Sequence, residues 1–284
     1  MKQKIVFFGS SKYVIPVIQT LKSANSRLNL ELVVTTEQNP NDAVPSFSIK
    51  NNIPYLSVSR LSHPIVNNKL SIVNAELAVL ADFGLIIPNT ILNLFPKGII
   101  NLHPSLLPKY RGPSPVQNAI LNGDKKTGNS IIILDEKVDH GPVLFQKEEK
   151  ISENDTAESL YLRLFKIGAD NLIEVINEYT NGKLKPVPQD HAKASFTKIL
   201  SRKDGFIDIG NCPPAEKIKQ MIRAYFPWPG VYFKTDLNGN EKIIKLLPKG
   251  KVQVEGKNPM SYKDFENGYS EGKNLLRKIG LIPN

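Results

Sequence analysis

Cysteine is almost absent from this chain, which has one, Cys212, among its 284 residues. A disulfide within the chain needs two thiols and a multi-thiolate metal site needs several, so the composition excludes both. We therefore expect the protein to act in a reducing compartment, the cytoplasm. No histidine lies close to Cys212 in sequence to activate its thiol, so we expect this cysteine to be incidental.

Long apolar runs are also missing. No stretch approaches the ~18 consecutive apolar residues that a membrane helix requires, and the run over residues 5–8 is shorter than the core of a signal peptide. The chain has no repeat, no low-complexity tract and no complete G-x-G-x-x-G dinucleotide fingerprint. With 40% hydrophobic and 23% charged residues, the composition is that of an ordinary globular protein.

Positive charge is abundant but unevenly placed. The net charge is +10, from 37 basic and 27 acidic residues. Residues 1–181 hold 18 basic and 17 acidic side chains, whereas residues 182–284 hold 19 and 10, so +9 of the +10 lies in the last third. Concentrated basic charge is typical of a module that binds a phosphate backbone, although a lysine-rich solvated surface would have the same composition.

The first two-thirds of the chain alternate between short apolar runs and helical patterns. Unbroken apolar strands are expected at residues 5–8 and 77–81 and a further strand at 30–35, with apolar residues at helical spacing between them. This order predicts an α/β fold with a doubly wound, mainly parallel, Rossmann-like sheet. A long amphipathic helix is expected over residues 156–182.

The last third has a different pattern. Prolines and polar residues predict a linker over residues 186–204, which divides a domain at 1–185 from one at 205–284. A strand at 206–209, a helix at 214–224 and two strands joined by an Asn238-Gly239 turn predict a small, OB-like β-barrel.

An amide and an imidazole stand two residues apart at the end of one predicted strand. Apolar residues 98–100 lead into Asn101 and His103, and Pro104 ends the strand. Side chains at i and i+2 lie on the same face of a strand, so both can point at one substrate atom. An amide donor beside an imidazole suits acyl transfer. The alternative is a strand end with an ordinary polar turn, in which His103 only bonds a backbone carbonyl.

Two longer strings carry a resemblance. Residues 101–112 read Asn-Leu-His-Pro-Ser-Leu-Leu-Pro-Lys-Tyr-Arg-Gly, and residues 138–142 read Val-Asp-His-Gly-Pro. Together they closely resemble the folate-dependent formyltransferases. The resemblance continues through residues 198–205, 223–229 and 260–265, which favours the members of this family that act on methionyl-tRNA over those of the purine pathway, which resemble only the first two-thirds.

The resemblance implies transfer of a formyl group from 10-formyltetrahydrofolate to the amino group of methionine on initiator tRNA, with no metal and by a monomer. It places Asn101, His103 and Asp139 in the catalytic group. The implied folate-binding residues are Phe83, Gly84, Leu85, Ile86, Ile87, Ser105, Leu106, Leu107, Pro108, Glu136 and Val138. The implied tRNA-binding residues are Arg111, Lys198, Arg202, Lys203 and Arg223.

Several alternatives stay open at this stage. Phe83, Leu85 and Ile87 could equally belong to the core, and Arg111 could position its loop rather than meet the tRNA. The chain also departs from typical bacterial members, because its loop at residues 36–50 is short and acidic rather than long and basic, and its C-terminal barrel is abbreviated. The rival functions are formylation of another amine, such as an amino-sugar nucleotide, and nucleic-acid binding by a protein with a decayed catalytic domain.

Overall fold

Two compact units make up the chain in this computed structural model, which describes residues 2–23, 27–237 and 239–283. The first unit contains residues 1–115, 127–150 and 161–197. The second contains residues 116–126, 151–160 and 198–284. The domain boundaries at 185 and 205 and the linker between them stay a prediction.

The first unit is an α/β fold, as predicted. Its strands are β1 (Gln3–Gly9), β2 (Leu28–Thr35), β3 (Tyr55–Ser57), β4 (Leu77–Ala81), β5 (Ile99–His103), β6 (Lys126–Ile133) and β7 (Val143–Lys150). Its helices are α1 (Ile15–Lys22), α2 (Ala43–Lys50), α3 (Pro64–Val73), α4 (Asn89–Leu92) and most of α6 (Ala157–Thr180), with short 3₁₀ turns η1 (Lys12–Val14) and η2 (His191–Lys193).

The strands of this unit form one sheet in the order β3-β2-β1-β4-β5-β6-β7 within the described residues. β1 to β5 pair in parallel, and β6 runs antiparallel to β5. The carboxyl ends of β1, β2, β4 and β5 therefore lie at one edge, which is where open α/β sheets bind ligands. The predicted mainly parallel sheet is confirmed.

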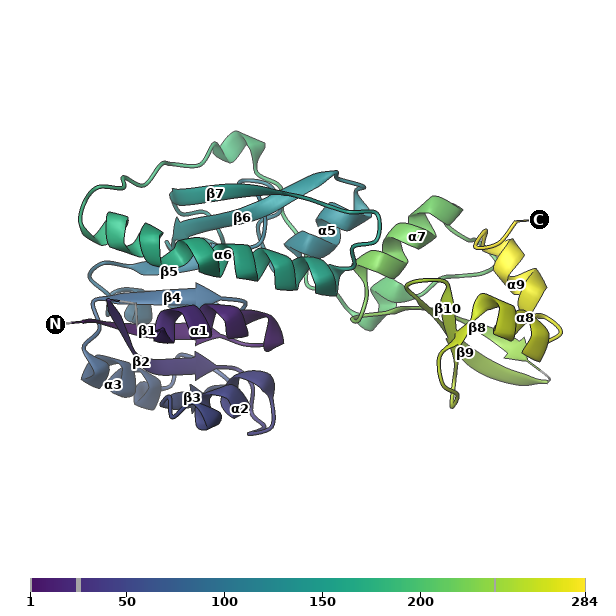
Figure 1. The fold of residues 1–284 in the computed structure, drawn as a ribbon, viewed down its shortest axis with the longest axis horizontal. Helices are drawn as coiled ribbons and strands as arrows, with labels where there is room; N and C mark the ends of the chain where they lie inside the picture. Colours follow the sequence, from purple (N-terminus) through teal and green to yellow (C-terminus); the bar gives the residue numbers. More distant parts are fainter. Residues whose placement is uncertain (1, 24–26, 238, 284) are drawn as a thin grey trace. The chain divides into compact units, whose positions relative to one another are not determined.

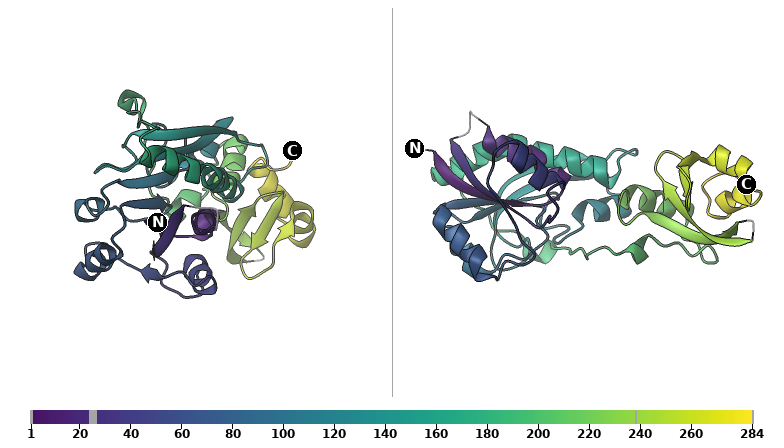
Figure 2. Two further views of the ribbon diagram at one scale, coloured as in Figure 1. Left: turned by 60° about the vertical axis from the view of Figure 1, so that its left-hand side comes forward. Right: turned by 90° about the horizontal axis from the view of Figure 1, so that it is seen from below.

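Apolar residues on both faces hold the sheet between helices (Figures 1 and 2). One face packs Val6 and Phe8 of β1 against α3 through Val66 and Leu70. Phe8 also meets Phe83 edge-on, with ring centroids 5.4 Å apart. Figure 1 shows α1 and α6 on the other face. Burial on both sides explains why these strands have no polar alternation.

Helix α6 approaches the strand that carries Asn101 and His103 closely. A Cβ built on Gly168 would lie 2.5 Å from Cδ2 of Leu102, so a glycine is required for the helix to reach this strand. Leu102 stands between Asn101 and His103 in β5 and points to the opposite face of the sheet. The packing of Leu102 against α6 thus directs the two polar side chains to the other side.

The second unit has a four-stranded antiparallel sheet in the order β11-β10-β9-β8 within the described residues, in line with a small, abbreviated barrel. Its α7 buries Ile218, Met221 and Ile222 at helical spacing. The elements are α5 (Pro115–Leu121), which begins at the border of the first unit, η3 (Arg202–Gly205), α7 (Ala215–Ala224), β8 (Val231–Leu237), β9 (Asn240–Leu247), β10 (Lys251–Val254), β11 (Met260–Ser261), α8 (Tyr262–Gly268) and α9 (Gly272–Lys278).

Two local predictions in this unit, a strand and a hairpin, have different outcomes. The strand expected at residues 206–209 is wrong, because only Phe206 forms an isolated bridge, to Tyr232, before the chain turns at Gly210. The hairpin expected between residues 237 and 240 is formed by β8 and β9, and Gly239 has the positive φ of 77° that such turns need. Asn238 lies outside the described residues.

Candidate active site

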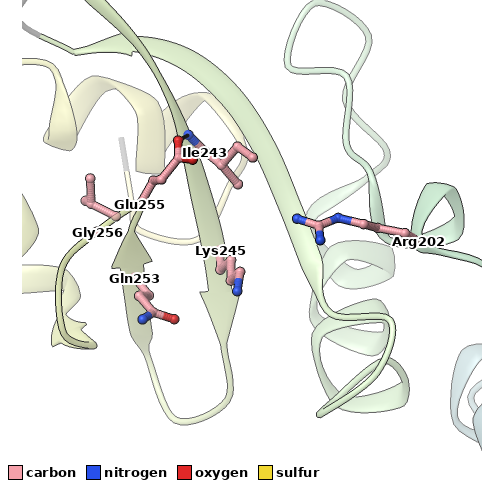
Figure 3. Close-up of a pocket in the computed structure, with 7 residues that line it drawn as sticks. Arg202, Ile243, Lys245, Gln253, Glu255 and Gly256 are labelled. Carbon is pink, nitrogen blue, oxygen red and sulfur yellow. Dashed lines mark hydrogen bonds between the residues drawn. The ribbon is translucent and has the colours of Figure 1, made fainter.

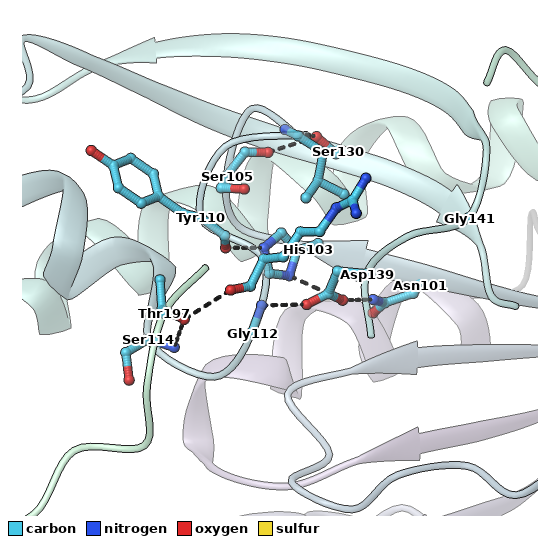
Figure 4. Close-up of polar contacts among 12 residues, drawn as sticks. Asn101, His103, Ser105, Tyr110, Gly112, Ser114, Ser130, Asp139, Gly141 and Thr197 are labelled. Atoms are coloured by element: carbon cyan, nitrogen blue, oxygen red, sulfur yellow. Dashed lines mark hydrogen bonds and ion pairs between the residues drawn. The ribbon is translucent and has the colours of Figure 1, made fainter. Parts of the chain in front are cut away.

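Asn101, His103 and Asp139 meet at the carboxyl end of β5 (Figure 4). The Asn101 amide Nδ2 donates to Asp139 Oδ1 at 3.1 Å, and His103 Nδ1 lies 3.5 Å from the same oxygen. All three residues are at most 9% exposed. The i, i+2 spacing therefore puts the amide and the imidazole together, and the turn after β6 brings the carboxylate to both.

The turn that carries Asp139 is held in a conformation that few residues tolerate. Asp139 has a positive φ of 48°, and a Cβ at Gly141 would lie 1.8 Å from the carbonyl oxygen of Ile133. Asp139 Oδ2 accepts a hydrogen bond of 2.7 Å from the backbone N–H of Gly112. The surrounding contacts thus determine an otherwise unfavourable backbone, as is common at functional sites.

The His103 ring lies between two acceptors. Its Nε2 is 3.0 Å from the carbonyl oxygen of Tyr110, which can only accept, so Nε2 carries a proton. Its Nδ1 faces the carboxylate of Asp139. With an acceptor at each ring nitrogen, this arrangement suits an imidazole that carries a proton on both.

The loop after β5, predicted to bind folate, is held by hydrogen bonds within the loop and to Ser130 of β6. Ser105 Oγ donates to the Lys109 carbonyl at 2.7 Å, and Ser130 Oγ donates to the Ser105 carbonyl at 2.6 Å and accepts from the N–H of Leu107 at 3.0 Å. Ser105 and Leu107 are buried, whereas Leu106 and Pro108 are half-buried. The side chains of Ser105 and Leu107 therefore stabilise the loop and are not open to a ligand.

The other predicted folate-binding loops lie next to each other. Asn89 Nδ2, just after the 82–88 loop, donates to Glu136 Oε1 at 2.9 Å. Phe83 and Ile87 belong to the hydrophobic core and Leu85 packs against it, so the core alternative applies to these three side chains. Gly84 is exposed. Ile86 and Val138 are 76% and 51% exposed, so each loop offers one large apolar side chain to a ligand.

Arg111 is buried rather than exposed at an RNA-binding surface, with a relative exposure of 3%. Its guanidinium donates to Gln189 Oε1 from Nε at 3.2 Å and from Nη2 at 2.7 Å. Nη2 also lies 2.8 Å from Nδ1 of His191. These contacts favour the positioning role for Arg111 over contact with tRNA.

Sequence reasoning did not identify Gln189 and His191 as part of this site. They precede a run that pairs with the active-site loop, because Arg111 donates to the carbonyl of Ser195 at 2.8 Å and accepts from the N–H of Thr197 at 2.7 Å. Residues 189–197, inside the predicted linker, are thus built against the catalytic loop. The only signal in the sequence was a polar Gln-Asp-His run after two prolines, which is too common to be diagnostic.

His191 is stacked on His140, the neighbour of Asp139, with ring centroids 4.0 Å apart and planes 5° apart. His140 Nδ1 bonds Asp135 Oδ2 at 2.6 Å. Because arginine cannot accept a hydrogen bond, His191 Nδ1 must be the acceptor towards Arg111 and the ring is neutral. Loss of hydration, followed by the charges of His140 and Arg111, lowers the pKa of His191 from its usual 6.5.

We expect the His140→Ala variant to raise the pKa of His191, because it removes a stacked ring that displaces water and a nearby positive charge. An NMR titration of the four histidine rings measures this directly. Since the folded-state pKa is below the unfolded one, the contribution of His191 to stability is complete above pH 6.5 and is lost as the pH falls through the lowered value. The control is His63→Ala, just before α3, which should leave the His191 titration unchanged. An unaltered pKa of His191 in the His140→Ala protein would contradict the effect of His140 on His191.

The short loop after β2 is organised around an acidic side chain. Glu37 Oε1 accepts from the N–H of Ser11 at 2.9 Å, and Oε2 accepts from the N–H of Val44 in α2 at 2.7 Å. Nearby, surrounding atoms reduce the hydration of the Asp82 carboxyl and raise its pKa, although the residue is exposed by surface area; its Oδ2 accepts from Ser11 Oγ at 2.6 Å. The loop after β2 is thus closed by its own carboxylate.

The other predicted tRNA-binding residues lie in the second unit. Lys198 Nζ is 2.5 Å from Asp204 Oδ1 and lowers the pKa of that carboxyl to about 2. Arg223 Nη1 donates to the carbonyls of Ser152 and Asp155, each at 3.2 Å. Arg202 and Lys203 are exposed. Arg223 therefore has a structural contact, whereas Arg202 and Lys203 present their charges to solvent.

Arg202 stands beside an aromatic pair and an open hollow. Its guanidinium lies over the Tyr232 ring at 5.3 Å, and Phe206 packs against that ring with centroids 5.6 Å apart. The hollow is lined by Arg202, Ile243, Lys245, Gln253, Val254, Glu255 and Gly256 (Figure 3). Cations beside aromatic rings are typical of surfaces that stack nucleic-acid bases.

Metal-binding clusters and membrane-spanning helices are both missing from residues 2–23, 27–237 and 239–283. Within them, no three His, Cys, Asp or Glu side chains gather closely enough to hold a metal ion. In the same part of the chain, no helix is both long and apolar enough to cross a membrane.

The chain is similar in sequence and in fold to proteins of a known family. Residues 3–176 match a family described as Formyl transferase. Methionyl-tRNA formyltransferase of Roseiflexus castenholzii is 40% identical over 238 residues, which cover 81% of this chain and 75% of that protein. The one from Thermodesulfovibrio yellowstonii is 32% identical over 302 residues, covering 94% and 96%. A sugar N-formyltransferase structure from a Shewanella species shares the fold, with a TM-score of 0.70, 21% identity and coverage of 88% and 99%.

Proposed function

Because the chain belongs to the formyl transferase family, we propose that it transfers a formyl group to the α-amino group of methionine on initiator tRNA. Relatives at 32–40% identity that cover most of the chain are methionyl-tRNA formyltransferases. The observation that carries the proposal is the convergence of Asn101, His103 and Asp139 in a buried cluster at the edge of the sheet where ligands bind.

The three side chains have complementary roles in this proposal. The amine nitrogen attacks the formyl carbon, and negative charge develops on the formyl oxygen. Asn101 uses one amide N–H towards Asp139, and its second N–H donates to that oxygen. Both ring nitrogens of His103 face other acceptors, so a protonated His103 stabilises the developing negative charge through its own positive charge. Asp139 keeps His103 charged and accepts the proton that leaves the amine, directly or through water. Collapse of the tetrahedral intermediate breaks the bond between the formyl carbon and the donor nitrogen, and that nitrogen takes up the proton that Asp139 accepted from the amine.

We infer that 10-formyltetrahydrofolate is the formyl donor. Its flat ring system needs apolar contacts on its faces and polar groups at its edge. The side-by-side loops at residues 82–88 and 135–139 fit this need, since Ile86 and Val138 are exposed apolar side chains and Val138 directly precedes Asp139. Ser105 and Leu107 would support the loop and not touch the ring, because they are buried.

The second unit is proposed to bind the tRNA backbone. Residues 182–284 carry a net charge of +9. Arg202 and Lys203 are exposed cations of that segment. The Arg202, Phe206 and Tyr232 group offers stacking beside positive charge. Monomeric state and cytoplasmic location stay predictions.

Formylation of an amino-sugar nucleotide is the second candidate function. The observation that favours it is the closed, acidic loop at residues 36–42, which lacks the basic side chains that typical relatives direct at tRNA. The sequence relatives favour the tRNA, since the likeness to the sugar enzyme rests on the fold at 21% identity.

One assay separates these candidates. The purified protein is incubated with 10-formyltetrahydrofolate and, in separate reactions, charged initiator methionyl-tRNA, charged elongator methionyl-tRNA, and a 4-amino-sugar nucleotide. We expect formylation of initiator methionyl-tRNA and none of the sugar. Equal rates on both tRNAs would show that this chain does not select the initiator, and formylation of the sugar alone would overturn the proposal.

A further inference from the structure

The side-chain amide of Gln189 uses all of its donors and acceptors to join two loops of the active site. Its Nε2 donates to the carbonyl of Asp139 at 2.9 Å and to the carbonyl of Gly141 at 2.7 Å. Its Oε1 accepts both bonds from the Arg111 guanidinium. An amide has two N–H groups and two lone pairs, so all four are used, in a side chain that is 7% exposed.

The orientation of this amide admits no alternative. Backbone carbonyls cannot donate and a guanidinium cannot accept, so exchanging the amide oxygen and nitrogen would oppose like groups at every contact. A buried polar side chain with every bond made restricts its surroundings to one arrangement.

The contacts close into a ring that contains the catalytic carboxylate. Gln189 donates to the Asp139 carbonyl, and Asp139 Oδ2 accepts from the N–H of Gly112. Gly112 follows Arg111 in the chain, and the Arg111 guanidinium donates to Gln189 Oε1, which closes the ring. This ring holds Asp139 at its positive φ of 48°. It thereby sets where the carboxylate stands relative to Asn101 and His103.

We propose that Gln189 is a positioning residue for formyl transfer, acting through Asp139, and that residues 189–197 belong to the catalytic machinery rather than to a passive linker. This inference rests on the proposed function, because it assigns Asp139 to the reaction. A misplacement of a reacting group by about 1 Å can cost 10²-fold in rate. Gln189 does not itself touch the substrate in this proposal.

The first test is Gln189→Glu, which keeps the shape and the acceptor towards Arg111 but places an oxygen against the carbonyls of Asp139 and Gly141. We expect kcat to fall about 10- to 100-fold, with the KM values for tRNA and donor changed much less. Gln19→Glu, an exposed position on α1, introduces the same charge and should keep the full rate. A folded Gln189→Glu protein with the rate of the unmodified chain would overturn the proposal.

A double-mutant cycle separates positioning from general damage to the fold. If Gln189 acts through Asp139, adding Gln189→Glu to Asp139→Asn should cost less than about 3-fold further, since the group being positioned is already altered. If Gln189→Glu lowered kcat by the same factor in the unmodified chain and in Asp139→Asn, the positioning role of Gln189 would be overturned.

A second measurement does not depend on activity. In Gln189→Glu, hydrogen exchange at the Gly112 amide, which bonds Asp139 Oδ2, should be accelerated more than at amides of β1. Unchanged protection of Gly112 would overturn the positioning role even if the formylation assay had failed for the unmodified chain. A failed assay with accelerated exchange at Gly112 would overturn only the proposed function and would leave the structural coupling in place.

Discussion

Replacing His103 by alanine is expected to lower kcat for formylation by about 10²- to 10⁴-fold, the usual range for losing a proton-transfer or oxyanion-stabilising group. The ring lies between the Tyr110 carbonyl and the Asp139 carboxylate, so its removal takes away the positive charge beside the reacting oxygen. Single-turnover kinetics measure the loss, and a separate binding assay should show the affinity for tRNA nearly unchanged.

The control for this variant is His63→Ala, the half-buried N-cap residue just before α3, which removes an imidazole outside the site and should retain the normal rate. Thermal unfolding checks that the buried His103 can be removed without loss of the fold. A folded His103→Ala protein with kcat within a few-fold of the unmodified chain would show that His103 serves only to bond a backbone carbonyl.

Replacing Asp139 by asparagine is expected to lower kcat by about 10²- to 10³-fold, a loss of the size seen when an electrostatic group is removed from a closed site. The two carboxylate oxygens face donors from Asn101 and Gly112. An amide of the same shape would turn its N–H₂ towards one of these donors and would leave the His103 ring without a carboxylate beside it. The measurement is kcat at saturating tRNA and donor.

Asp170→Asn provides the matched control for the change in charge. Asp170 forms an exposed ion pair with Lys166 on α6 at 3.0 Å, and such surface pairs contribute little. Loss of this ion pair should alter neither kcat nor the free energy of unfolding measurably. If Asp139→Asn were as active as Asp170→Asn, the carboxylate would have no part in the reaction, and the positioning role of Gln189 would lose its target.

Local sequence patterns predicted the α/β fold and two of the three catalytic candidates. Alternation along a strand is a backbone property, so Asn101 and His103 had to share a face whatever the rest of the chain did. Unbroken apolar strands such as β4 implied a sheet covered on both sides. The strand at residues 206–209 was not formed, because a four-residue segment is a weak signal on its own.

Contacts between distant segments could not be read from local patterns. Phe83 and Ile87 follow a strand end, as ligand-binding residues often do, yet they complete the core. Arg111 is a cation in a loop, which usually means exposure, yet its partners Gln189 and His191 come from far along the chain. Burial of a charge depends on partners that only the tertiary structure supplies.

The sequence by itself indicated the class of chemistry, because residues 101–112 and 138–142 resemble the folate-dependent formyltransferases. Strand alternation added that Asn101 and His103 share one face. The sequence also determined the excess of basic charge in residues 182–284. The tertiary structure alone decided that Arg111 is buried and that Gln189 links it to Asp139. Those roles depend on hydrogen bonds between residues far apart in sequence, and no local spacing encodes which donor meets which acceptor.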